Sequence, residues 1–121
     1  GDHGTTYGGN PFVGAAVDTV LKMMERDRIT GHVKEITPYL EQKLDALVEK
    51  YDFLTARRGL GLMQGVVCEK PVGKIASAAL EHGLVVITAG ADVLRFVPPL
   101  IIGKEHVDEM AEKLDAVLAE M

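Results

Sequence analysis

The first half of the chain carries two stretches in which apolar residues recur at helical spacing. The first stretch predicts an amphipathic helix from about residue 11 to residue 25, because apolar side chains recur at intervals of three and four positions. The second stretch runs from Val33 to Tyr51 and stays in phase across Pro38. This phase favours one long helix with a kink or a restart near Thr37 and Pro38 over two unrelated helices.

The second half of the chain alternates short apolar runs with glycine-rich and proline-rich turns. Gly83 is placed to end a short helix, and the pair Pro98 and Pro99 ends a strand because neither residue can donate to a β-ladder. The expected elements are strands 54–58 and 62–69 around a hairpin turn at 59–61, a helix over 72–82, strands 84–88 and 93–97, and a last helix from about 104 to 121.

This order of elements predicts an α+β fold, a two-layer arrangement with helices packed on a small, mostly antiparallel sheet. The charged connector at residues 25–28 separates the first helix from the rest. We therefore place a domain boundary near residues 26–32, and the first helix could belong to a neighbouring domain.

Composition narrows the classes of partner. The 121 residues carry a formal net charge of −5 and no basic block, which argues against binding to nucleic acid or to an anionic membrane surface. Cys68 is the single cysteine, so no internal disulfide can form, and this usage fits a cytoplasmic location. Because the chain opens on a glycine-rich loop with no element before it, we expect a fragment of a longer protein.

The opening loop, residues 1–11, contains four glycines and the adjacent hydroxyls of Thr5 and Thr6 directly before a helix. Asn10 is a favoured N-cap, and Pro11 suits the first helical turn. Free amides and hydroxyls near a helix N-terminus predict an anion site, most often for phosphate. The alternative interpretation is a tight turn that only leads into the helix.

Arg95 is a charged residue within the apolar run 93–97. Arginine is suited to binding a carboxylate with two parallel hydrogen bonds, so Arg95 is a candidate carboxylate ligand. The alternative is a surface or structural salt bridge, which strand alternation also permits.

Other residue patterns do not support a site. The four histidines have no second ligand at metal spacing, so we predict no metal site. Cys68 is interpreted as a small strand residue. The glycines over 59–65 have the wrong spacing for dinucleotide binding, and a strand follows where a helix should begin.

Three blocks of the chain form a recognisable set. The first block is His3–Pro11, the second is Arg58–Met63, and the third joins Ala89–Gly90 to Val93–Leu100. Together these blocks resemble the class III (ornithine/acetylornithine-type) aminotransferases, which use pyridoxal 5′-phosphate. They occur in the family's order and cover essentially the whole chain. The third block is most similar to the acetylornithine branch, although the ornithine and 4-aminobutyrate branches share much of the pattern.

The resemblance implies a role for each candidate site residue. Thr6 would donate to the cofactor phosphate with Thr5 beside it, and the loop would reach the active site of the other subunit of a homodimer. Arg95 would bind the α-carboxylate of glutamate or of the amino donor. Residues 1–28 would be a loop and helix from the end of the large domain, and residues 29–121 would be the C-terminal small domain of a fold-type I transferase.

The resemblance also implies an absence. The family's Schiff-base lysine lies upstream of the loop, and none of the eight lysines here matches its motif. We assign no catalytic residue in this chain and expect the 121 residues alone to be inactive. The expected reaction of the intact protein is amino transfer from N-acetylornithine to 2-oxoglutarate in arginine biosynthesis. Alternatives are ornithine, 4-aminobutyrate or succinylornithine as donor, or a non-catalytic α+β binding module.

Overall fold

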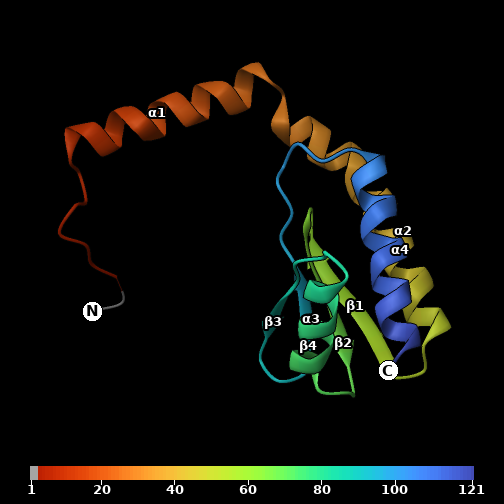
Figure 1. Ribbon diagram of the computed structural model, residues 1–121. Helices are drawn as coiled ribbons and strands as arrows, with labels where there is room; N and C mark the ends of the chain where they lie inside the picture. Colours follow the sequence, from red (N-terminus) through yellow and green to blue (C-terminus); the bar gives the residue numbers. More distant parts are fainter. Residues whose placement is uncertain (1–2) are drawn as a thin grey trace. The chain divides into compact units, whose positions relative to one another are not determined.

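The computed structural model describes residues 3–121. The chain divides into two compact units, of which the first ends at Gly31 and the second comprises His32–Met121 (Figure 1). Gly1 and Asp2, the first two residues of the predicted loop, lie outside the described residues. The elements are α1 (Pro11–Arg26), α2 (Ile29–Lys50), β1 (Leu54–Leu60), β2 (Met63–Cys68), α3 (Val72–Glu81), β3 (Ile87–Ala89), β4 (Val93–Phe96) and α4 (Lys104–Ala119).

Helix α1 confirms the first predicted helix and its start. The Asn10 side chain accepts a hydrogen bond of 2.9 Å from the Phe12 N–H, and Pro11 occupies the first turn. No residue of α1 is buried within the described part of the chain, so its apolar stripe is uncovered there.

Helix α2 confirms the single long helix, with Pro38 inside it. Pro38 has no N–H to donate, and on the residue before it the Thr37 hydroxyl donates to the Val33 carbonyl at 2.6 Å. The buried face consists of Ile36, Leu40, Leu44 and Leu47. It is the predicted apolar stripe, so tertiary packing holds the helix across the proline.

The sheet has four strands in the order β1-β2-β4-β3, and every neighbouring pair is antiparallel. The α+β prediction is therefore confirmed. The predicted strand 84–88 was placed too early, because β3 begins only at Ile87. Leu84 and Val86 instead turn inward toward the core that the helices cover.

The predicted hairpin is confirmed, but its turn was placed one to two residues too early, at 59–61. β1 continues through Gly59 to Leu60, and the chain reverses at Gly61 and Leu62. Gly61 has a φ of +57°, which favours glycine, and Leu62 is buried in the core. Gly59 serves close packing: a Cβ there would lie 2.8 Å from the Gln64 Cα.

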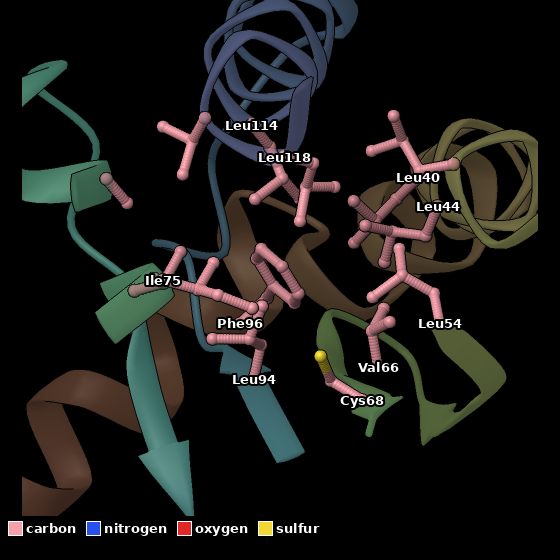
Figure 2. Close-up of a cluster of buried hydrophobic side chains, with 14 of the residues drawn as sticks. Leu40, Leu44, Leu54, Val66, Cys68, Ile75, Leu94, Phe96, Leu114 and Leu118 are labelled. Atoms are coloured by element: carbon pink, nitrogen blue, oxygen red, sulfur yellow. The ribbon is translucent and has the colours of Figure 1, made fainter. Parts of the chain in front are cut away.

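The core lies on one face of the sheet, between β2 and β4 on one side and the three helices α2, α3 and α4 on the other. Figure 2 shows Val66, Leu94 and Phe96 from the sheet directed toward the leucines of α2 and α4. Polar contacts also join α2 to α4, where the Tyr39 hydroxyl donates to Asp108 at 2.7 Å. The opposite face of the sheet is left uncovered by residues 32–121. In the described part of the chain, no helix is long and apolar enough to cross a membrane.

Candidate functional site

The opening loop folds as a turn over residues 6–9 that leads directly into α1. The Thr5 hydroxyl accepts a hydrogen bond of 3.3 Å from the Tyr7 N–H, and the Asn10 N–H donates to the Tyr7 carbonyl at 3.2 Å. Gly9 has a φ of +74°, a backbone conformation that side chains rarely adopt. These bonds and this glycine fix the turn, while Thr5 and Thr6 remain exposed.

Hydrogen-bond donors of the turn are available to a ligand. Within residues 3–121 the Thr6 hydroxyl has no protein partner, and the N–H groups of Thr6, Gly8 and Gly9 have no acceptor. A side chain would meet nothing within 4 Å at Gly4 or Gly9, so the surrounding space is open. Hydroxyls and amides next to a helix N-terminus form a donor set that fits a phosphate group.

Arg95 lies in the middle of β4, between the buried residues Leu94 and Phe96. Strand alternation directs those two side chains into the core and Arg95 to the uncovered face. Arg95 is exposed, and no carboxylate of residues 3–121 lies within 4 Å of its guanidinium. Of the alternative interpretation, the structural salt bridge is not formed within residues 3–121, whereas the exposed position agrees with a surface role.

Residue Arg95 is also one of the residues around a largely apolar pocket of about 350 Å³ at the end of β4. The strand's own continuation, Val97, Pro98 and Pro99, forms one wall, and α4 contributes Val107 and Met110. The two prolines have fixed φ angles, which hold this wall rigid. An exposed guanidinium is suited to bind a small carboxylate-bearing molecule.

The candidate residues belong to different units. Thr5 and Thr6 lie in the unit that ends at Gly31, and Arg95 lies in the unit that begins at His32. The turn that is predicted to bind phosphate and the strand that is predicted to bind a carboxylate are thus the two halves of the predicted site, one in each unit. Each half is built locally, the first by a capped turn and the second by strand alternation.

Two other predictions concern residues outside these halves. Cys68 is 2% exposed and belongs to the core, and burial raises the pKa of its thiol. Among residues 3–121, no three His, Cys, Asp or Glu side chains are grouped so that they could hold a metal ion.

One residue near Arg95 was not singled out from the sequence. Arg58 is exposed on β1, and its side chain lines a shallow hollow of the uncovered sheet face together with Arg95. The sequence did contain a signal for Arg58, because this residue is the first of the second block that resembles the family. Its position two strands from Arg95 depends on the sheet order, which the sequence pattern did not determine.

Comparisons with known proteins give the chain's relatives. The sequence model of the family described as aminotransferase class-III matches residues 1–118. The chain is 41% identical over 126 residues to the acetylornithine aminotransferase of Parasynechococcus marenigrum (strain WH8102), covering all of this chain and 30% of that protein. It is also 41% identical over 121 residues to the acetylornithine aminotransferase of Methanocaldococcus jannaschii, again covering all of this chain and 30% of the relative.

Solved structures agree with these relatives. The crystal structure of N-acetylornithine aminotransferase from Stenotrophomonas maltophilia K279a is similar with a TM-score of 0.81 and 34% identity, over 93% of this chain and 32% of that one. An acetylornithine aminotransferase from Elizabethkingia anophelis has the same fold, with a TM-score of 0.88 at 24% identity. The chain thus spans about 30% of the length of the curated relatives that it matches.

Proposed function

Because the chain belongs to the class-III aminotransferase family, we propose that it is the C-terminal part of an acetylornithine aminotransferase. The reaction is transfer of the δ-amino group of N-acetylornithine to 2-oxoglutarate, which yields N-acetylglutamate semialdehyde and glutamate for arginine biosynthesis. The observation that carries this proposal is 41% identity, over the whole chain, to the acetylornithine aminotransferases of Parasynechococcus marenigrum and Methanocaldococcus jannaschii. We place the protein in the cytoplasm, in keeping with its single cysteine.

Under this proposal, residues 1–28 extend from the large domain of the enzyme and residues 29–121 form its small domain. Thr6, with Thr5 beside it, donates hydrogen bonds to the phosphate of pyridoxal 5′-phosphate. The donor set of the turn supports this role, since the Thr6 hydroxyl and three amides have no protein acceptor in residues 3–121. In a homodimer, the turn would serve the site of the other subunit. Pyridoxal phosphate, when bound, supplies the electron sink for amino transfer.

Arg95 binds the α-carboxylate of glutamate, or of the amino donor, in the same proposal. Its guanidinium is exposed and has no carboxylate partner in the described chain, so it is available to a ligand. Arg95 therefore acts by positioning the substrate and takes part in no proton transfer.

The proton-transferring lysine of the enzyme is not assigned to this chain. Four of the eight lysines pair with carboxylates on helix surfaces: Lys22, Lys43, Lys50 and Lys113. No lysine lines the pocket beside Arg95 or the hollow that Arg95 shares with Arg58. We accordingly propose that the isolated 121 residues have no transaminase activity.

The test of the substrate role uses the full-length enzyme with Arg95→Gln and Arg95→Lys. Loss of a charge-assisted hydrogen bond pair costs roughly 1.5–3 kcal/mol, so Arg95→Gln raises the KM for glutamate about 10- to 100-fold. Arg95→Lys keeps the positive charge but cannot form two parallel hydrogen bonds to a carboxylate, so we expect its KM for glutamate to lie between those of the parent and Arg95→Gln. An unchanged KM for glutamate in Arg95→Gln would refute the carboxylate role.

The test of the cofactor role uses Thr6→Val in the same enzyme, with Thr55→Val as the matched control. Thr55 is exposed on β1 and belongs to neither half of the site. We expect Thr6→Val to weaken pyridoxal phosphate binding about tenfold, as loss of a hydrogen bond to a charged group predicts. Equal affinity in the two variants, measured by equilibrium dialysis, would exclude a phosphate contact at Thr6.

The choice of amino donor is tested separately. Rates on N-acetylornithine, ornithine, 4-aminobutyrate and N-succinylornithine are compared at equal enzyme concentration. The proposal predicts the highest kcat/KM for N-acetylornithine, and a higher value for another donor reassigns the enzyme within the family.

A further inference from the structure

A row of four residues crosses the uncovered face of the sheet from edge to edge. Arg58 on β1 lies opposite Gly65 on β2, Gly65 lies opposite Arg95 on β4, and Arg95 lies opposite Ile87 on β3. Directly paired residues of an antiparallel sheet direct their side chains to the same face. The two arginines therefore project from one face with only a glycine between them.

Gly65 makes room between the two guanidinium groups. Glycine has no side chain to fill this space. A Cβ at position 65 would lie 3.0 Å from Val93 Cγ1, which is closer than side chains normally pack. Strands are spaced by about 4.8 Å, so the Arg58 and Arg95 Cα atoms are about 10 Å apart. Both side chains line one shallow hollow, whose other walls include Leu60 and Met63. We call this feature the arginine hollow.

The neighbouring residue Arg57 shows what a paired arginine looks like in this fold. Arg57 projects toward α2, where its Nε lies 2.6 Å from Asp45 Oδ1 and its Nη1 lies 3.1 Å from Glu41 Oε1. Arg58, one position later, projects to the other face, and no carboxylate of residues 3–121 lies within 4 Å of it.

The hollow therefore holds two like charges with no counter-charge from residues 3–121. Two guanidinium groups beside apolar walls repel each other unless an anion lies between them. Arginine pairs of this kind favour planar anions such as carboxylates, which accept hydrogen bonds on both oxygens. The chemistry of the hollow thus matches a small carboxylate.

We propose that Arg58 is a second binding residue for the same substrate carboxylate that Arg95 binds. This inference rests on the proposed function of Arg95 and extends it from one guanidinium to two. Each guanidinium binds the carboxylate from one side, and Gly65 leaves the space that the carboxylate occupies. Arg58 thereby raises the affinity for 2-oxoglutarate and glutamate without entering the proton transfers.

The test uses the full-length enzyme with the variants Arg58→Gln, Arg58→Lys, Arg95→Gln and the double variant Arg58→Gln/Arg95→Gln. The readouts are the KM for 2-oxoglutarate, kcat, the melting temperature and the inhibition constant of glutarate, a dicarboxylate that cannot accept an amino group. Lys74→Gln is the matched control, because Lys74 is an exposed cation without a carboxylate partner in residues 3–121, on the helix-covered side of the sheet.

We expect Arg58→Gln to raise both the KM for 2-oxoglutarate and the inhibition constant of glutarate about tenfold, with kcat held within about twofold. Arg58→Lys is expected to recover part of the affinity. It also replaces Arg58→Gln as the test variant if Arg58→Gln fails to fold. Because the two arginines share one carboxylate, the effect of the double variant is smaller than the product of the two single effects. Lys74→Gln leaves both constants unchanged.

Three results would overturn the inference. If Arg58→Gln leaves both constants unchanged while Arg95→Gln raises them, Arg58 does not bind the carboxylate, although the proposed role of Arg95 stands. A lower melting temperature with unchanged constants assigns Arg58 to a protein carboxylate instead. An equal loss in Lys74→Gln shows a long-range charge effect and no contact. If neither Arg58→Gln nor Arg95→Gln changes the constants, the proposed function itself fails.

Discussion

At the scale of single residues, Arg57 and Arg58 are adjacent on one strand, but Arg57 is paired with carboxylates whereas Arg58 has no carboxylate partner in residues 3–121. Arg57 is hydrogen-bonded to Asp45, Glu41 and the side chain of Gln64, which is only 1% exposed. Gln64 in turn donates to the Gly61 carbonyl at 2.7 Å, so this network holds the hairpin turn against α2. The partners of Arg57 lie in elements other than its own strand, so the sequence pattern could not reveal them.

Removal of the Arg57 side chain is expected to destabilise the chain. Arg57→Ala leaves the carboxylates of Asp45 and Glu41 without their cation and frees the buried Gln64 oxygen, which predicts a loss of about 2 kcal/mol in the free energy of unfolding. Urea denaturation measures it. The matched control is Arg58→Ala on the same strand, which is expected to change that free energy by less than about 0.5 kcal/mol. Equal losses in the two variants would contradict the structural role of Arg57.

Asp115 predicts a pH dependence of stability. Hydrogen bonds from Lys50 Nζ and the Tyr51 hydroxyl lower the pKa of the Asp115 carboxyl below its ordinary value. The folded state therefore binds this proton less readily than the unfolded state, and the contribution is fully present above about pH 4. It is lost as the pH falls through the lower pKa of the folded chain.

The measurement is the free energy of unfolding of the chain as a function of pH, with Asp115→Asn as the variant. Asp115→Asn is expected to be less stable than the parent at pH 7, and the difference is expected to shrink as the pH falls below 4. Asp52→Asn, at an exposed position without an ion pair in residues 3–121, serves as the control for loss of one charge. A difference that stays constant down to the lowest pH would argue against the titration of Asp115.

The surroundings of the candidate site residues were predictable to the extent that neighbouring residues along the chain determine them. The Asn10 cap, Pro11 and the glycines around Thr5 and Thr6 determine the turn from neighbouring residues alone, and the structure shows that turn. The exposure of Arg95 follows from alternation along one strand. The arginine hollow, by contrast, depends on β2 lying between β1 and β4, and this order is set by packing over the whole sheet.

At the scale of elements, apolar periodicity predicted the helices well, and α2, α3 and α4 each bury one apolar stripe in the core. The apolar face predicted for the last helix comprises Val107, Met110, Leu114, Val117, Leu118 and Met121. Four of these residues are buried in α4, whereas Met110 is half-buried and Met121, beyond the end of the helix, is exposed. The strands were less well bounded, since a three-residue strand such as β3 carries too few positions for a pattern. The hairpin turn was misplaced because glycine marks both turns and close approaches of backbone, and at Gly59 it marks the second.

A pair of glycine substitutions separates these two uses of glycine. Gly59→Ala places a methyl group 2.6 Å from the Gln64 Oε1 and 2.8 Å from its Cα, so the hairpin must distort, and we expect a loss of more than about 2 kcal/mol. In Gly73→Ala, within α3, the new methyl group meets nothing within 4 Å, and the change is expected to be neutral or stabilising by up to about 1 kcal/mol. Urea denaturation of both variants decides between them, and equal effects would contradict the packing role of Gly59.

At the scale of the whole molecule, the two units differ in how they are stabilised. The unit His32–Met121 has its own core, whereas α1 has no buried residue and exposes Phe12, Val17 and Leu21 among other apolar side chains. An amphipathic helix of 16 residues gains little stability in water from its own hydrogen bonds. Under the proposed function, the remaining part of the enzyme covers this apolar stripe.

Hydrogen exchange tests that expectation directly. In the isolated 121-residue chain, the amides of α1 are expected to exchange much faster than those of α2 and α4. Only α2 and α4 bury apolar side chains in a core, which opposes their local opening. In the full-length enzyme, the α1 amides become protected to the level of the core helices, since burial of the stripe couples their opening to unfolding of a larger unit. The residues around Leu44 and Leu114 provide the internal reference, because they are buried in the isolated chain already. Equal exchange of α1 in the two proteins would mean that the stripe stays uncovered, and the assignment of residues 1–28 to the large domain would then lose its support.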